Sequence, residues 1–366
     1  MIKVGIDASR VRDGMTGAGR YASGIFAPLD AAMPDAQFIL YTCGDGAISL
    51  PSSRWRVRRD ANWALRRLPV TFWIHFRLAS LINADRPDVF WAPNTLTPKG
   101  LRGSIPCVTS VLDFNHILVP ETLPPTTRIA SRRWMDADVR AAARNVAISN
   151  GTAQRMLNLL GRRADAIAYP AVPAMPPPPK EADALRLLGE FGVLRPFLLT
   201  VGTRAPRKNL ASAVAAMEIL RRRGCLLDHQ LVMAGPEAWD RRGRNIERKN
   251  GRGWIKPLGF VEDRLLAALY ATAEALVFPS LYEGFGMPVV EARAYGCRVV
   301  TTDSPELREA GGEDAIYTDT TPEAIAEGIR VALKRPSPLA RPIERDWEDA
   351  AKTIAALLYE AALPKR

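Results

Sequence analysis

Cysteine and histidine are scarce in this sequence, which has four cysteines and three histidines among 366 residues. They are widely spaced and include no C-x-x-C pair: Cys43, Cys107, Cys225, Cys297, His75, His116 and His229. Scattered thiols of this kind are typical of buried, reduced cysteines rather than of a disulfide framework. Zinc sites need several such ligands at short spacing. We therefore expect neither structural disulfides nor a metal site.

Long apolar runs are also missing. No stretch of about 18 uncharged apolar residues occurs, which excludes a typical membrane-spanning helix. The N-terminus enters a strand-like run within residues 1–7 and lacks the pattern of a signal peptide. These absences predict a cytoplasmic protein. With 47% hydrophobic residues, the chain is long enough for two ordinary α/β domains.

Acidic residues are too few to balance the basic ones, so the formal net charge is +11. Such a charge is typical of proteins that bind nucleic acid, an anionic membrane surface or a phosphorylated substrate. The alternative is that the basic side chains only form a solvated surface. No recognisable nucleic-acid-binding motif accompanies it. Residues 54–77 combine seven arginines and one aspartate with tryptophan and phenylalanine. This composition favours contact with anionic lipid for residues 54–67, whereas residues 72–82 are more typical of an amphipathic helix packed on a sheet.

The most informative stretch is residues 283–291, with the sequence EGFGMPVVE. It follows an apolar run that is typical of a buried strand. Gly284, Gly286 and Pro288 interrupt any continuous helix, so we expect a glycine loop and then a helix with the proline in its first turn. Amides at such a helix start bind phosphate, and the flanking glutamates suit hydroxyl groups. A nucleotide sugar is the leading ligand, although the same pattern can serve only to turn the chain.

The first half alternates strand-like runs with helical segments, and its strands are expected at residues 3–7, 37–42, 87–94 and 105–112. Residues 17–22 match the G-x-G-x-x-A pattern of a dinucleotide-binding turn, but they start about ten residues too late after the first strand. Ligands bind beyond the carboxyl ends of parallel strands. Asp113, with Asn115 and His116, is therefore a candidate site, and the alternative is that Asp113 caps the next turn.

Four consecutive prolines at residues 176–179 predict a stiff linker, so we place the domain boundary between residues 172 and 173. The second domain is expected to end near residue 345, and a final helix at about 346–366 can pack back on the first domain. After a strand at residues 197–201, Arg207 and Lys208 precede a helix, where two cations can neutralise a diphosphate. The βα alternation in both halves predicts α/β domains with parallel sheets.

Together these motifs resemble those of the family-four retaining glycosyltransferases. The matching segments are residues 16–21, 201–203, 206–209, 279–288, 291–292 and 346–350, in the expected order, and the two glutamates have the family's E-x7-E spacing. The resemblance implies the GT-B fold, in which two Rossmann-like domains face each other across a cleft. Among family members, the chain is similar to bacterial enzymes of polysaccharide assembly, mannosyltransferases in particular.

The resemblance also implies roles for individual residues. Arg207 and Lys208 would hold the donor diphosphate and stabilise the charge that develops on it, and Glu283 would accept hydrogen bonds from the donor sugar. Asp113 would face the acceptor and completes the catalytic set. The other implied donor-binding residues are Gly17, Gly19, Thr203, Gly284, Phe285, Gly286, Met287 and Glu291, the last of which would bind the ribose.

One position departs from the family pattern. Relatives commonly have histidine directly before the aspartate that matches Asp113, where it contacts the donor sugar, and here Leu112 takes that place. His116 either substitutes for the missing histidine or is a satisfied structural side chain, and the second interpretation is favoured. The sugar specificity of relatives therefore does not transfer directly.

As a family member, the protein would transfer a hexose, with mannose weakly favoured, from a GDP- or UDP-sugar to a saccharide acceptor that is lipid-linked. The reaction would retain the configuration of the transferred sugar and would need neither a metal ion nor a cofactor. The enzyme would act in the synthesis of surface polysaccharide or lipopolysaccharide. The basic region would hold the protein on the inner face of the cytoplasmic membrane, and no nucleic acid is expected. The alternatives are a non-catalytic nucleotide-sugar-binding protein and a nicotinamide-dependent oxidoreductase that uses residues 17–22. The sequence does not identify the donor base, the linkage or the oligomeric state.

Overall fold

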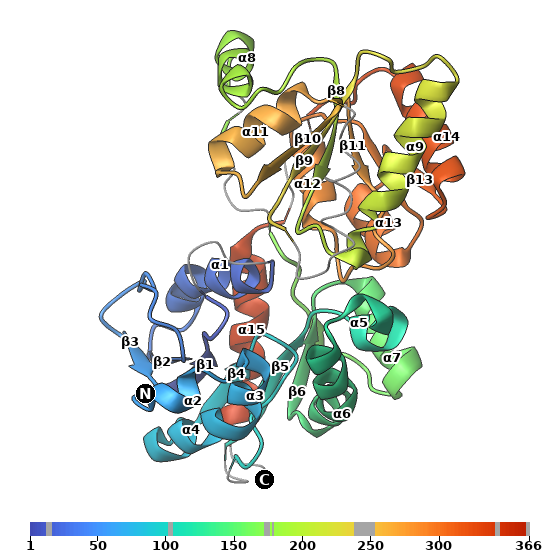
Figure 1. Ribbon diagram of the computed structural model, residues 1–366. Helices are drawn as coiled ribbons and strands as arrows, with labels where there is room; N and C mark the ends of the chain where they lie inside the picture. The colour runs from blue at the N-terminus through green and yellow to red at the C-terminus, as the bar shows by residue number, and fades with distance from the viewer. Residues whose placement is uncertain are drawn as a thin grey trace. The chain divides into compact units, whose positions relative to one another are not determined.

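The chain forms two compact units, Met1–Ala171 with Arg345–Arg366 and Val172–Glu344 (Figure 1). The computed structural model describes residues 1–11, 17–101, 105–171, 176–177, 179–237, 253–340 and 345–363. Each unit contains one parallel β-sheet with helices packed on it, which confirms the predicted class of two parallel-sheet α/β domains. Of the expected proline linker, residues 172–175 and Pro178 lie outside the described residues.

The sheet of the first unit has the strand order β3-β2-β1-β4-β5-β6-β7. Its strands are β1 (Ile2–Asp7), β2 (Ala36–Thr42), β3 (Trp55–Arg59), β4 (Val89–Ala92), β5 (Cys107–Val111), β6 (Arg144–Ala147) and β7 (Ala166–Ile167). The chain moves from β1 outward to β3 and then returns to the other side of β1 at β4. The connection therefore reverses direction between β1 and β4, and this pair of strands is the topological switch point of the sheet.

Helices and short helical turns connect these strands. They are α1 (Gly17–Ala32), α2 (Trp63–Arg66), α3 (Val70–Trp73), the π-helix η1 (Ile74–Leu78), α4 (Ala79–Asp85), α5 (Asn115–Leu118), η2 (Pro120–Thr122), α6 (Pro125–Ala141) and α7 (Asn150–Leu160). The turn that the G-x-G-x-x-A pattern indicates at residues 17–22 is not formed, because Gly17 and Gly19 lie in the first turns of α1. They therefore do not form the tight turn of a dinucleotide site, and residues 12–16 of that motif lie outside the described part.

The C-terminal helix α15 (Trp347–Ala362) belongs to the first unit and lies beside α1 (Figure 1). Asp346 caps its start by accepting a hydrogen bond from the Asp349 amide at 2.8 Å. The Trp347 ring packs so closely on Gly24 of α1 that a Cβ atom there would lie 2.5 Å from it. A glycine at this position thus lets the last helix approach the first one.

Residues 55–59 of the basic segment form the edge strand β3, which the sequence did not predict. Trp55 is buried and stacks on Phe38 of the neighbouring strand, with ring centroids 4.0 Å apart. Arg54 pairs with Asp30 at 2.6 Å, and both Arg56 and Arg58 pair with Asp85. These arginines tie the edge of the sheet to neighbouring helices.

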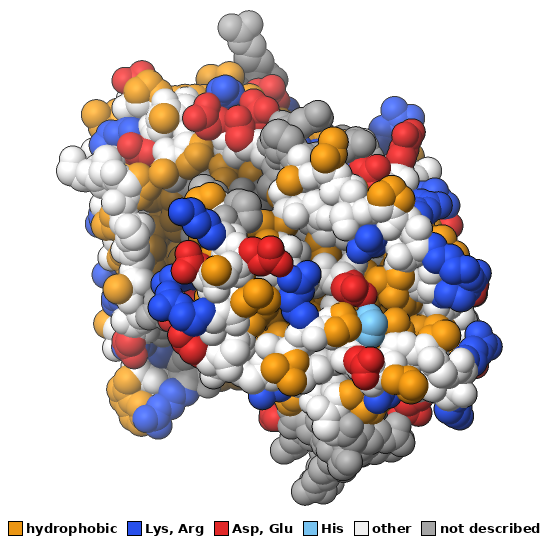
Figure 2. Space-filling view, turned by 90° about the horizontal axis from the view of Figure 1, so that it is seen from above, with side chains coloured by type: hydrophobic (Ala, Val, Ile, Leu, Met, Phe, Trp, Pro, Cys, Tyr) orange, Lys and Arg blue, Asp and Glu red, His pale blue; other side chains and the backbone are white. Residues whose placement is uncertain are grey.

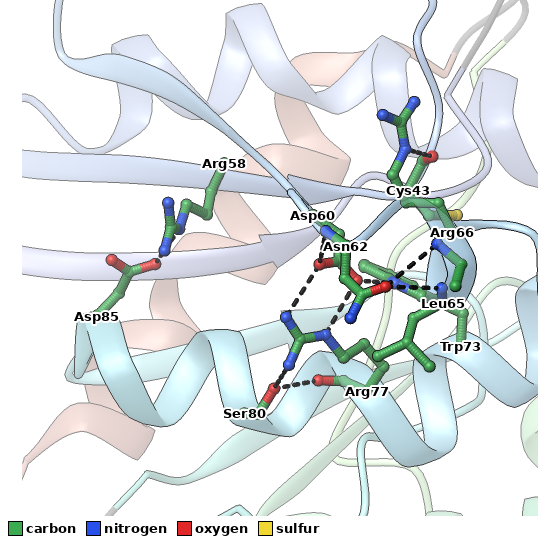
Figure 3. Close-up of polar contacts among 11 residues, drawn as sticks. Cys43, Arg58, Asp60, Asn62, Leu65, Arg66, Trp73, Arg77, Ser80 and Asp85 are labelled. Atoms are coloured by element: carbon green, nitrogen blue, oxygen red, sulfur yellow. Dashed lines mark hydrogen bonds and ion pairs between the residues drawn. The ribbon is translucent and has the colours of Figure 1, made fainter.

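A second group of contacts fixes the segment that follows β3 (Figure 3). Asp60 is buried and accepts hydrogen bonds from the indole of Trp73 at 2.9 Å and from the guanidinium of Arg77 at 3.0 Å. Arg77 lowers the pKa of Asp60 against the opposing effect of burial. Arg66 donates to the Cys43 carbonyl and pairs with Asp45. Arg66 and Arg77 are therefore paired with carboxylate and carbonyl groups of the first unit.

The second unit has the strand order β10-β9-β8-β11-β12-β13, again all parallel. Its strands are β8 (Phe197–Val201), β9 (Gln230–Ala234), β10 (Ile255–Gly259), β11 (Ala275–Phe278), β12 (Val299–Thr302) and β13 (Ile316–Thr318). The helical segments are α8 (Glu181–Glu190), η3 (Pro206–Lys208), α9 (Leu210–Arg222), α11 (Asp263–Thr272), α12 (Met287–Ala294), α13 (Pro305–Gly311) and α14 (Pro322–Lys334).

Alternating side chains of β8 supply the cores on the two faces of this sheet. Phe197 and Leu199 pack with residues of α11, α12 and α13, whereas Leu198 between them packs with α9 and α14. This is the period of two that a strand covered on both faces requires. The sheet edge formed by the carboxyl ends of the strands remains available for loops that bind a ligand.

The net positive charge does not form one continuous area on the face drawn in Figure 2. Lysine and arginine side chains are interspersed there with aspartate and glutamate, and hydrophobic side chains lie between them. The described residues of this face therefore do not form the single large basic surface that is typical of proteins that bind a nucleic-acid backbone.

Candidate functional site

The candidate site lies at the carboxyl ends of β8 and β11, which are neighbours in the second sheet. The short helix η3 follows β8 and carries Arg207 and Lys208, and the glycine loop with Glu283 follows β11. The amide of Leu281 donates to the carbonyl of Arg207 at 2.8 Å, which joins the two loops. Lys208 and Glu283, which are 75 positions apart in the sequence, thus meet because their strands are adjacent.

Glu283 holds both cations. Its Oε2 lies 2.6 Å from Nη1 of Arg207, and its Oε1 lies 2.6 Å from Nζ of Lys208. The Glu283 side chain is buried, and burial alone would raise its pKa. Arg207 and Lys208 outweigh this effect and lower the pKa to about 2. The carboxylate is therefore ionised at physiological pH and serves as the counter-ion of both cations.

Lys208 is positioned from two further sides. Its Nζ lies 4.4 Å from the ring centroid of Phe278 at the end of β11, within cation–π range. Its side chain also passes close to Gly202, where an added Cβ atom would lie 3.1 Å from Cε. Gly202 has a φ of +127°, so its backbone favours glycine as well. Burial lowers the pKa of Lys208, and Glu283 opposes that shift.

The glycine loop and the helix that follows it are confirmed. Gly286 is the N-cap of α12 with a φ of +105°, and Pro288 lies in the first turn. A Cβ atom on Gly286 would lie 2.7 Å from Cδ2 of Leu307, so the position has no space for a larger residue. Phe285 is buried, and Met287 begins the helix and is partly buried. Backbone amides are thus presented next to the cation pair at the positive end of a helix dipole.

Glu291 lies inside α12, where a tyrosine contacts its carboxylate. It is buried, and its Oε2 accepts a hydrogen bond from the hydroxyl of Tyr270 at 2.7 Å. Burial and, secondarily, Glu291 raise the pKa of Tyr295 to about 12.

The sequence did not indicate a role for Tyr270 or Phe278. Both lie in apolar segments, where an aromatic residue normally indicates only a core position.

Two buried hydroxyl groups at the same sheet edge have no hydrogen-bond partner among the described residues. They are Oγ of Ser280, two residues beyond β11, and Oγ1 of Thr302, the last residue of β12. Buried polar groups are nearly always hydrogen-bonded in proteins, and exceptions are common at ligand sites. Thr203, which was expected to bind the donor, lies in the loop after β8, partly buried.

The remaining predicted site residues belong to the first unit. Asp113 follows β5 and accepts a hydrogen bond from the Asn115 amide at 3.1 Å, as in the turn-capping alternative. His116 is buried, and its Nε2 lies 2.7 Å from Oδ1 of Asp136, which agrees with the structural interpretation of this histidine. Gly17 is exposed at the start of α1, and Gly19 is buried within it.

The described part of the chain has no group of three or more His, Cys, Asp or Glu side chains that could hold a metal ion. Within the same residues, no helix is long and apolar enough to cross a membrane.

Comparisons with known proteins show similarity to glycosyltransferases. The family model described as "Glycosyl transferases group 1" matches residues 192–354, which contain the cation pair and both glutamates. O-antigen chain mannosyltransferase B from Escherichia coli is 27% identical over 281 residues, which cover 74% of this chain and 73% of that protein. The chain also matches a GDP-mannose-dependent alpha-(1-6)-phosphatidylinositol dimannoside mannosyltransferase from Mycobacterium tuberculosis, with 30% identity over 178 residues. That match covers 46% of this chain and 45% of the relative.

A solved structure extends the likeness over both units. Sucrose-phosphate synthase from Thermosynechococcus elongatus superposes on the chain with a TM-score of 0.70 and 16% identity, covering 99% of this chain and 96% of that one. At this level of identity the superposition establishes the fold. Taken with the family match and the sequence relatives, it supports a GT-B glycosyltransferase similar to the family-four enzymes.

Proposed function

We propose that the protein is a retaining hexosyltransferase that needs no bound metal and transfers mannose from GDP-mannose to a saccharide acceptor in bacterial surface polysaccharide synthesis. The observation that carries this proposal is the pair of cations that Glu283 holds beside the start of α12. The names of the E. coli and mycobacterial relatives support mannose, and the second also supports GDP and a lipid acceptor.

The cation pair accounts for the chemistry of the donor. When the bond between the sugar carbon and the diphosphate oxygen breaks, its electrons remain on the diphosphate and increase the negative charge there. Arg207 and Lys208 stabilise that charge, because preorganised donors interact more strongly with the transition state than with the ground state. In many transferases a metal ion supplies this charge, and here the two side chains supply it.

Glu283 orients the two cations and keeps them charged in a buried position. Once the diphosphate binds, the glutamate also accepts hydrogen bonds from sugar hydroxyls. The acceptor hydroxyl attacks the sugar carbon from the side of the leaving diphosphate, and its proton passes to a diphosphate oxygen. Configuration is then retained, and no protein nucleophile is needed.

The other donor-binding residues surround this centre. Backbone amides of Gly284, Phe285, Gly286 and Met287 bind phosphate and sugar oxygens, with Thr203 beside them. Glu291, which Tyr270 holds in place, accepts hydrogen bonds from the ribose. In the first unit, Asp113 contributes to the acceptor side, and Gly17 and Gly19 contribute to donor binding.

The proposal is tested with a panel of GDP-, UDP- and dTDP-sugars, in which release of the nucleoside diphosphate is measured. GDP release from GDP-mannose, at least tenfold faster than release from the other donors, is the expected result. Release from UDP-glucose alone would contradict the choice of donor. Tight binding of a nucleotide sugar without any turnover would favour the non-catalytic alternative.

We also propose that the first unit contacts anionic lipid at the inner face of the cytoplasmic membrane, through α2. Trp63 is 68% exposed, and the guanidinium of Arg67 lies 5.0 Å from its ring centroid. This exposed pair combines the aromatic and the cationic groups that membrane interfaces bind.

Liposomes that contain anionic phospholipid test this surface in a flotation assay at low salt. Replacing both Trp63 and Arg67 with serine is expected to lower the bound fraction several-fold, because an arginine near an anionic surface contributes about 1 kcal/mol and the exposed indole is removed with it. Leu194→Ser is the control, because Leu194 is 64% exposed in the other unit. Unchanged binding of the double variant would refute the role of α2.

A further inference from the structure

The carboxyl edge of the first sheet carries its own arrangement of buried polar groups. Asp7 ends β1, and Asn94 follows the end of β4 by two residues. These two strands pair directly and form the switch point of the sheet, which is where open parallel sheets bind ligands. The first unit therefore has a candidate site that is independent of the donor site in the second.

Asp7 and Asn94 form one hydrogen-bonded pair. Nδ2 of Asn94 donates to Oδ2 of Asp7 at 2.9 Å, and the amide of Ser9 donates to Oδ1 of Asp7 at 2.9 Å. Burial raises the pKa of Asp7, while these two N–H donors favour its ionised form. The amide nitrogen of Asn94 faces Asp7 in this contact, and its amide oxygen points elsewhere.

That oxygen has no hydrogen-bond partner among the described residues, although Asn94 is only 7% exposed. The next strand end repeats the pattern, since Oδ1 of Asn115 and Nδ1 of His116 after β5 are also buried without a partner there. Such atoms occur elsewhere in the described chain as well. These three lie beyond neighbouring strand ends, at the edge where open parallel sheets bind ligands, and a ligand is one partner that would satisfy them.

The two strand ends are held in a fixed arrangement. The amide of Thr95 donates to the carbonyl of Ser110 at 2.9 Å, and the amide of Leu112 donates to Oγ1 of Thr95 at 3.0 Å. The loop that carries Asn94 is thus bonded to the segment that leads into Asp113. Rigid support of this kind is what a recognition site needs.

We propose that Asn94 accepts a hydrogen bond from a hydroxyl group of the acceptor saccharide and that Asp7 is a positioning residue that orients the Asn94 amide. The inference rests on the proposed transferase function and assigns the acceptor side of the same reaction. Saccharide hydroxyls are suitable ligands, because each can donate to the amide oxygen and accept from neighbouring donors.

Octyl α-D-mannoside as acceptor and GDP-mannose as donor test the assignment. Asn94→Ala is expected to raise the KM for the mannoside about tenfold, the value of one hydrogen bond. The KM for GDP-mannose and the slow release of GDP without acceptor are expected to stay within about twofold. Asn158→Ala, at an exposed position on α7, is the matched control and is expected to change neither quantity. Equal losses in donor hydrolysis and acceptor use by Asn94→Ala would overturn the proposal.

Exchanging the side chains of Asp7 and Asn94 distinguishes a loss of acceptor binding from a loss of folding. Asn94→Asp alone places two carboxylates against each other and is expected to impair acceptor use. The double variant Asp7→Asn with Asn94→Asp restores the hydrogen bond and again leaves an acceptor oxygen at position 94. Recovery of the mannoside KM to within about threefold of the wild type is expected, and no recovery in a folded double variant would overturn the proposal.

A binding measurement keeps this inference distinct from the transferase proposal. If the wild type releases GDP from no donor, the proposed function fails, but saturation-transfer NMR with octyl α-D-mannoside still tests the subsite. A signal in the wild type that is lost in Asn94→Ala supports it. Equal signals in both proteins, or none in either, would contradict it.

Discussion

Replacing Arg207 with alanine is expected to lower kcat/KM for the sugar donor by about 10²–10³-fold, the usual loss when one charge-stabilising donor is removed from a transition state. Arg207 is partly buried and fixed by Glu283 and by the Tyr282 carbonyl, to which its Nη1 donates at 2.7 Å. Its charge therefore needs no reorganisation as the diphosphate leaves. Steady-state release of GDP from GDP-mannose measures the effect.

Two further variants show whether the loss of kcat/KM in Arg207→Ala comes from the charge and geometry of this arginine. Arg207→Lys keeps the charge but not the forked geometry and is expected to lie between the wild type and the alanine variant. Arg222→Ala removes an exposed arginine from the end of α9 and is expected to keep full activity. A near-normal kcat/KM for Arg207→Ala would mean that the diphosphate binds elsewhere.

Glu283→Ala is expected to destabilise the second unit by about 3–5 kcal/mol, the cost of breaking a buried ion pair by removing one partner. Arg207 and Lys208 would then repel each other without a counter-ion, so transferase activity would also fall. The urea dependence of amide exchange in β8 and β11 measures the stability change within this unit. Glu190→Ala, at the exposed end of α8, is the control.

The stability that Glu283 contributes also depends on pH in a defined direction. Its pKa is about 2 in the folded unit, lowered from 4.5, so the unfolded chain binds the proton more readily. The contribution is thus complete above about pH 4.5 and is lost as the pH falls toward 2. The stability difference between the wild type and Glu283→Ala should narrow over that range. A difference that stays constant would contradict the buried ion pair.

Local patterns predicted much of the fold. The apolar runs predicted β1, β2, β4 and β5 of the first sheet and β8 and β11 of the second, and the glycines with Pro288 predicted the loop and the start of α12. Strand β3 was missed because arginines occupy its solvent-facing positions and hid the alternation. Their partners, such as Asp30 and Asp85, lie on helices about 25 residues away, and only the folded sheet brings them together.

The sequence predicted which residues form the donor site but not which of their side chains contact each other. Glu283, Arg207 and Lys208 were all expected near the donor, yet nothing in the sequence shows that one glutamate holds both cations, because the pairing of β8 with β11 creates that contact. Asp7 and Asn94 were not singled out at all. They are 87 residues apart and have no motif, and only the switch point between β1 and β4 connects them.

The central claim is that the cations held by Glu283 bind the diphosphate of the donor. Isothermal titration calorimetry with GDP and with guanosine tests it most directly. The wild type is predicted to bind GDP at least about 100-fold more tightly than guanosine, since charged hydrogen bonds to phosphate supply the difference, and Arg207→Ala is predicted to lose most of that preference. Equal affinities for GDP and guanosine in the wild type, or an unchanged preference in Arg207→Ala, would contradict the claim.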